Sequence, residues 1–185
     1  MNIVLIVIVV IIVLILIWAI GVYNSFMTLK NKIEEAFSTM DVYLKKRYDL
    51  IPNLVETVKG YAKHESETLE NVINARNKAV NATSTSEKIQ ANAQISTLMP
   101  AINALSEAYP DLKANENFLA LQKDLSTIEG EITNARKYYN AVVNKFNTNC
   151  DIFPSVIIAN MMHLEKRVLF EVSNETEREN VQVKF

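Results

Sequence analysis

The residues best able to do chemistry in this 185-residue chain are two histidines, one cysteine and several carboxylates. His64 and Glu65 begin a stretch similar to the zinc-protease motif, which needs a second histidine four residues after the first. Position 68 is Thr68, and the only other histidine is His163, far along the chain. A composite site of both histidines and a Glu is an alternative, but the pattern favours polar side chains at the surface or between helices.

Other catalytic patterns are also missing. The sequence places no His or Lys beside Cys150 that would turn this thiol into a nucleophile. The Glu-x-x-His pairs of di-iron bundles are absent, and three glycines are too few for a phosphate-binding loop. We therefore predict a protein that is not an enzyme, with no catalytic residues, no cofactor and no metal.

One set of polar residues surrounds Pro52 in the sequence. In the first interpretation these residues satisfy one another structurally or contact a partner, and in the second they form a hydrolase site. The set consists of Arg47, Asp49, Asn53, His64 and Glu65.

Composition excludes several classes of protein. Only 3 Gly and 4 Pro argue against a turn-dense all-β fold. A formal charge of -2 argues against nucleic acid as a partner, because nucleic-acid-binding proteins usually carry a basic excess. One cysteine excludes a disulfide framework.

The N-terminal segment is apolar throughout. It begins at Ile3 and ends at Val22, which matches the roughly 20 helical residues that cross a bilayer. Trp18 and Tyr23 lie near its end, where amphipathic rings favour the interface. A buried soluble helix and a cleaved signal peptide are the alternatives, and we predict a single-pass anchor at residues 1–23. Lysines follow this segment and none precedes it, so the positive-inside rule places the C-terminal domain in the cytoplasm.

The remaining chain is predicted to be all-α. Apolar residues recur every three or four positions over residues 26–80, and Pro52 either kinks or breaks that helix. A polar connection at 81–87, with Ser84 or Ser86 as the helix N-cap, leads to a helix at 87–108 and a loop at 109–114. Four heptads at 118–146 form the most regular seam, and a shorter helix runs from 153 to 168.

Long amphipathic helices with short connections favour an antiparallel four-helix bundle, here continuous with the membrane helix. We assign residues 24–172 to this bundle. Residues 173–185 are predicted to form a polar, flexible tail.

Several blocks of the sequence resemble the LemA family of bacterial membrane proteins. They include residues 41–55 (DVYLKKRYDLIPNLV), 56–62 (ETVKGYA) and 107–115 (EAYPDLKAN). The resemblance covers nearly the whole chain, although Phe37 stands where the family usually has Trp. It implies one N-terminal membrane helix, a cytoplasmic or membrane-proximal helical bundle and no established catalytic residues.

We therefore expect a membrane-anchored scaffold or adaptor whose partners are the lipid bilayer and other membrane or membrane-associated proteins. Tyr48, Tyr61 or Tyr138 would anchor such a partner in an exposed groove between helices. The alternatives are a self-assembling structural protein, which would be a homo-oligomer, and the hydrolase.

Overall fold

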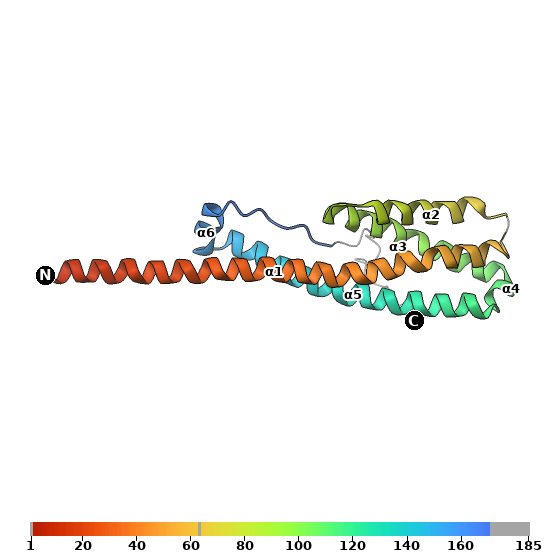
Figure 1. The fold of residues 1–185 in the computed structure, drawn as a ribbon, viewed down its shortest axis with the longest axis horizontal. Helices are drawn as coiled ribbons and strands as arrows, with labels where there is room; N and C mark the ends of the chain where they lie inside the picture. Colours follow the sequence, from red (N-terminus) through yellow and green to blue (C-terminus); the bar gives the residue numbers. More distant parts are fainter. Residues whose placement is uncertain (1, 63, 171–185) are drawn as a thin grey trace, which may run out of the picture. The chain divides into compact units, whose positions relative to one another are not determined.

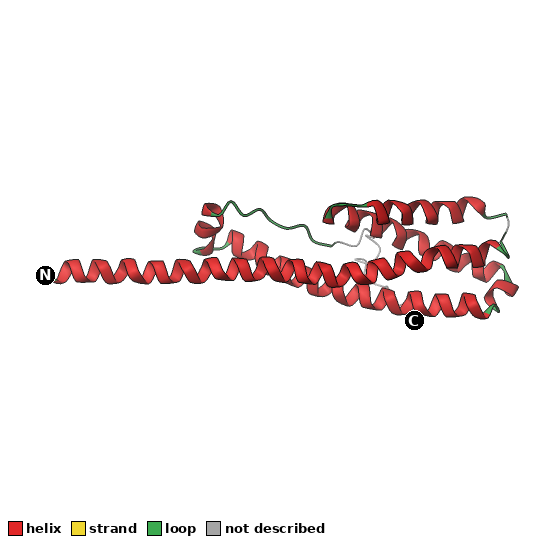
Figure 2. Ribbon diagram, viewed as in Figure 1, coloured by secondary structure: helices red, strands yellow, loops and turns green. Residues whose placement is uncertain are grey.

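The computed structural model describes residues 2–62 and 64–170, and over these ranges the chain is helical with no strand (Figures 1 and 2). This confirms the predicted all-α fold class. The helices in order are α1 (Ile3–Lys59), α2 (Ser66–Asn81), α3 (Thr85–Ala108), α4 (Pro110–Lys113), α5 (Glu116–Asp151) and α6 (Ser155–Met161). The predicted tail at 173–185 lies outside the described residues.

Two compact units divide the chain. One contains Met1–Ser38 and Lys137–Leu169, and the other is built on Thr39–Arg136, so that α1 and α5 contribute to both. The domain boundary at residue 23, which rests on the membrane segment, stays a prediction.

In the first unit, the N-terminal turns of α1 are apolar and uncovered. Every side chain from Ile3 to Ile17 is at least 42% exposed. This helix is long and apolar enough to cross a membrane. As predicted, it continues past Val22 without interruption. Beyond that point it buries Phe26, whose ring meets Phe146 of α5 edge-on at 5.8 Å between centroids.

The second half of α1 tests the two predictions for Pro52. The helix continues through Pro52 as far as Lys59, so the prediction of a break was wrong. The prediction of one helix continuing to residue 80 was also wrong, because α2 starts separately at Ser66. Gly60 follows the last residue of α1 and favours non-helical backbone. Periodicity missed this boundary because Leu69 and Val72 continue the three-four spacing inside α2, where both are buried.

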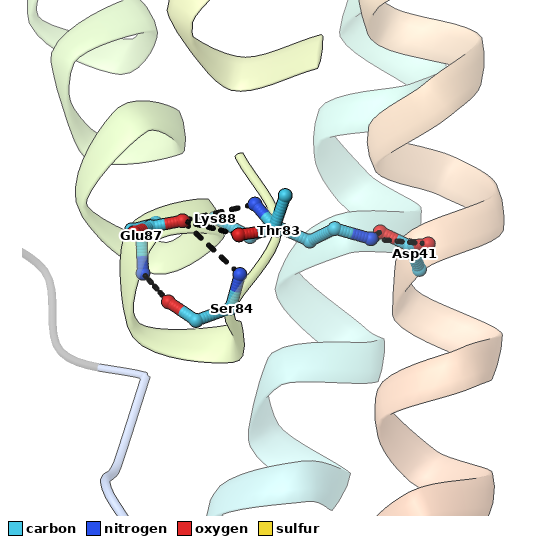
Figure 3. A network of polar contacts seen from close by, with 5 residues as sticks. All are labelled: Asp41, Thr83, Ser84, Glu87 and Lys88. Carbon is cyan, nitrogen blue, oxygen red and sulfur yellow. Dashed lines mark hydrogen bonds and ion pairs between the residues drawn. The ribbon is translucent and has the colours of Figure 1, made fainter. Parts of the chain in front are cut away.

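The start of α3 follows the predicted capping chemistry (Figure 3). The Ser84 hydroxyl accepts a hydrogen bond from the backbone N–H of Glu87 at 3.1 Å. The Glu87 carboxylate accepts one in return from the N–H of Ser84 at 3.1 Å, which completes a capping box. Ser84 is thus the N-cap, and α3 begins at Thr85. The loop predicted at 109–114 contains the short helix α4, since Pro110 suits a first helical position.

The predicted seam lies on α5, which is longer than expected at Glu116–Asp151. The predicted helix from 153 to 168 was wrong beyond Met161. His163 has φ 51°, a left-handed conformation that ends the helix. The backbone that follows is held by Asn147, which accepts from the N–H of Arg167 at 2.8 Å and donates to its carbonyl at 2.9 Å.

Candidate functional site

Arg47 is the most unusual side chain of the second unit, since it is only 1% exposed. It lies on α1 in phase with the buried Leu44 and Ile51. Its Nη1 donates to Asn92 Oδ1 at 2.9 Å and to Ser96 Oγ at 3.1 Å, both on α3. Its Nε lies 2.8 Å from Glu129 Oε1 on α5. One guanidinium therefore links three helices.

The guanidinium is only partly satisfied. The contact of Nε with Glu129 is an ion pair without a well-directed hydrogen bond, and Nη2 has no hydrogen-bond partner in the described part of the chain. Burial lowers the pKa of Arg47, and the Glu129 carboxylate opposes this effect. A buried donor without a partner destabilises a fold by about 1–3 kcal/mol. An incompletely paired buried group of this kind needs a physical explanation, and a bound ligand is one.

A groove of about 770 Å³ lies beside this arginine. Apolar side chains of all three helices line part of it: Leu54, Met99, Ile102, Phe118, Leu119 and Leu125. Amides and hydroxyls line the rest, with Ser96, Asn103, Gln122, Ser126 and Thr133 among them. Binding sites in proteins commonly combine an apolar wall with a few polar groups that set orientation.

The charges at the groove are predominantly positive. Arg47, Lys123 and Arg136 line it, and Glu129 is the one carboxylate among the described lining residues. The Glu129 side chain is 41% exposed, so it can move toward water when another anion approaches Arg47. The groove is therefore suited to a ligand that carries carboxylate or amide oxygens next to apolar groups.

Neighbouring contacts hold the same helices in place. Lys88 of α3 places its Nζ 2.8 Å from both carboxylate oxygens of Asp41 on α1 (Figure 3). Arg76 of α2 donates from Nε to the carbonyl of Tyr48 at 3.1 Å. These contacts fix the spacing of α1, α2 and α3, and with it the shape of the groove wall.

The polar set predicted around Pro52 is not gathered in one place. Arg47 is buried, whereas Asp49 is exposed and pairs with Lys45 at 2.9 Å. Asn53 and His64 are exposed, and Glu65 is half-buried just before α2. A functional role of the set as a whole stays a prediction.

Sequence reasoning found Arg47 but missed the three side chains that hold it. Asn92, Ser96 and Glu129 come from helices well separated in the sequence. One signal was available, because an arginine between Leu44 and Ile51 on the apolar face of a helix requires a buried partner.

The predicted tyrosine anchors separate into two kinds. Tyr48 is 5% exposed and its hydroxyl has no partner in the described chain, so it cannot reach another protein. Burial raises the pKa of Tyr48 to about 12. Tyr61 and Tyr138 are 40% and 52% exposed, so both remain available as anchors. No cluster of three or more metal-binding side chains occurs in the described ranges.

An apolar helix long enough to cross a bilayer, continuous with a helical bundle, defines a membrane-associated helical-bundle protein. Residues 36–185 match the model of the LemA family, and the chain belongs to that family. The chain is also similar to Protein LemA of Metamycoplasma hominis (strain ATCC 23114 / DSM 25592 / NBRC 14850 / NCTC 10111 / PG21). The two are 29% identical over 163 residues, which cover 88% of this chain and 74% of the relative.

Proposed function

We propose that this protein is a membrane-anchored adaptor that binds a segment of another protein in the groove beside Arg47. The observation that carries this proposal is Arg47 itself, a buried and incompletely paired guanidinium that is among the residues lining a groove. A purely structural arginine would gain stability from a complete set of hydrogen bonds.

The partner segment we propose is extended or helical, with a carboxylate or amide next to an apolar side chain. Its oxygen would take the place beside Arg47 that Glu129 partly fills. Its apolar group would pack on Met99 and Leu119. The excess of positive charge at the groove would favour acidic segments and speed their association.

We further propose that α1 stays in the membrane as an anchor and that the bundle lies in the cytoplasm. Lys30 and Lys32 follow the apolar segment, and no lysine or arginine precedes it, which supports this orientation. Fusions after Phe185 test it: fluorescence from a cytoplasmic reporter without activity of a periplasmic one is expected, and the reverse pattern would place the bundle outside.

A binding role is proposed in place of a catalytic one. Asp49 is engaged by Lys45, and His64 and Asn53 face solvent, so these groups do not converge on a common substrate position. A hydrolase would need an acid, a base or a nucleophile within hydrogen-bond reach of one another.

Photo-crosslinking in living cells tests the groove. A photoreactive amino acid at Leu119 lies in the groove, and the same group at Thr127 lies on the same helix outside it. We expect one discrete crosslinked product from position 119, none from 127, and loss of the product in Arg47→Met. Equal products from both positions, or a product from 119 that survives Arg47→Met, would refute the groove as the binding site.

A further inference from the structure

The first unit exposes a cluster of large apolar side chains around α6. Phe153 is 79% exposed, Met161 72%, Ile152 48% and Ile157 47%. Ile157 and Met161 are four residues apart and share one face of α6, while Ala159 on another face is buried. Short as it is, α6 is therefore amphipathic, and its outer face is apolar.

The packing of α5 on α1 shows which residues of α1 lie level with this cluster. Phe37 contacts Tyr139 and Phe26 contacts Phe146, so the two helices run antiparallel in this unit. At about 1.5 Å per residue on both helices, Asp151 lies level with Gly21 when counted from the Phe26 contact and level with Ser25 when counted from the Phe37 contact. The chain then passes directly into Ile152 and Phe153.

These levels lie at or just beyond the end of the apolar segment that spans residues 3–22. Trp18, Ala19 and Val22 are half-buried, whereas the side chains from Ile3 to Ile17 are exposed, so packing in this unit begins where the apolar segment ends. Figure 1 shows α6 following the blue end of α5 in this part of the molecule. If α1 crosses a bilayer, Ile152 and Phe153 lie at the boundary between acyl chains and headgroups.

The charges nearby permit contact with lipid. Asp151 is the carboxylate next to the cluster, and it forms an ion pair with Lys166 at 2.8 Å. Its negative charge is therefore neutralised and does not repel anionic lipid headgroups. A short amphipathic helix with a bulky apolar face is the kind of element that lies in the interface, about 5–10 Å deep.

We propose that residues 152–161 form a second membrane contact, with Phe153, Ile157 and Met161 inserted in the lipid interface beside the transmembrane segment. Lipid is favoured over a protein partner because the exposed cluster lies level with the end of the apolar segment of α1. This contact would hold the first unit against the bilayer, in addition to the single span. It depends on α1 being in the membrane but not on the groove.

Tryptophan fluorescence of the full chain in lipid nanodiscs tests this proposal, because Trp18 is the only tryptophan. In a Trp18→Phe background, Phe153→Trp and Ile157→Trp each report one position of the cluster. The matched control is Tyr138→Trp, because Tyr138 is also exposed on the first unit. Its neighbour Tyr139 contacts Phe37 of α1, far from the apolar segment. Phe37 lies about 22 Å beyond Val22 along α1, at a rise of 1.5 Å per residue.

Lipids brominated near the headgroup end of the acyl chain are expected to quench the indole introduced at position 153 or 157. The quenching should lie within a factor of about two of that of native Trp18. The Tyr138→Trp control is expected to be quenched by aqueous iodide and not by lipid. Indoles at 153 and 157 that are accessible to iodide but not to brominated lipid would overturn the proposal. Protection from both quenchers would also overturn it, because it would mean that protein covers the cluster.

Discussion

The hydrogen bond between Arg47 and Asn92 allows a sharp test of how the second unit is held together. Asn92 is 3% exposed, and its Oδ1 accepts from Arg47 Nη1 at 2.9 Å. Removing one partner leaves the other buried without a hydrogen bond, whereas removing both replaces a polar pair with an apolar one. A double-mutant cycle with Arg47→Met and Asn92→Leu separates these cases.

The expected magnitudes follow from burial. Arg47→Met leaves the Asn92 oxygen unsatisfied, at about 1–3 kcal/mol, but it also removes a buried charge and an unpartnered Nη2. Asn92→Leu leaves Nη1 of the charged guanidinium with Ser96 alone, and we expect a loss of about 2–3 kcal/mol. The double variant should lie within about 1 kcal/mol of the native protein, since Glu129 is exposed enough to be solvated once Arg47 is gone.

Guanidinium unfolding of the full chain in detergent micelles, followed by circular dichroism, measures these free energies. In thermal unfolding of a chain of this size, a loss of 1 kcal/mol would lower Tm by about 2–4 °C. Ser96→Ala is the matched control, because Nη1 keeps its bond to Asn92, and a loss of only about 0.5–1 kcal/mol is expected. If the double variant loses the sum of the two single losses to within about 0.5 kcal/mol, the two side chains are not coupled and the reasoning is wrong.

Three further predictions concern single residues. Ser84→Ala should destabilise the protein by about 1 kcal/mol, because α3 loses its N-cap; an unchanged unfolding midpoint would contradict this. The N–H groups of Ser84 and Thr83 lower the pKa of Glu87, so the stability it adds is present at neutral pH and is lost as pH falls through that lowered pKa; NMR titration of Glu87 against Glu87→Gln unfolding curves checks the direction. Gly130→Ala should stabilise α5 by about 1 kcal/mol, since an added Cβ meets no atom within 4 Å, and a lower Tm would show that this space is not open.

Periodicity in the sequence predicted the elements whose signal is local. The apolar stretch that starts at Ile3 and the seam of α5 each lie within one helix, and Ser84 is a cap defined by its neighbours within three residues. The boundary at Gly60 was missed, because apolar spacing continues on both sides of it. The end of α6 was missed because Leu164 and Val168 continue the spacing, while the backbone there is held by Asn147 and Tyr139 of α5.

The contacts of the candidate site could not be predicted from the sequence, for a different reason. Arg47 meets Asn92 and Ser96 across separations of 45 and 49 residues, and no local pattern relates these positions. Two of the groups predicted to join Arg47, Asp49 and Asn53, point elsewhere on α1. On a helix of 3.6 residues per turn, positions two and six residues away face different directions from Arg47.

Stability and function make opposite demands on Arg47, and this opposition can be measured. A bundle under selection for stability alone would favour an apolar residue between Leu44 and Ile51, because burying a guanidinium with an unpartnered nitrogen gains little. The double variant Arg47→Met/Asn92→Leu should therefore fold almost as well as the native protein but lose the crosslink from Leu119. If it folds and keeps that crosslink, Arg47 serves the packing of α1, α3 and α5, and the partner binds elsewhere on the bundle.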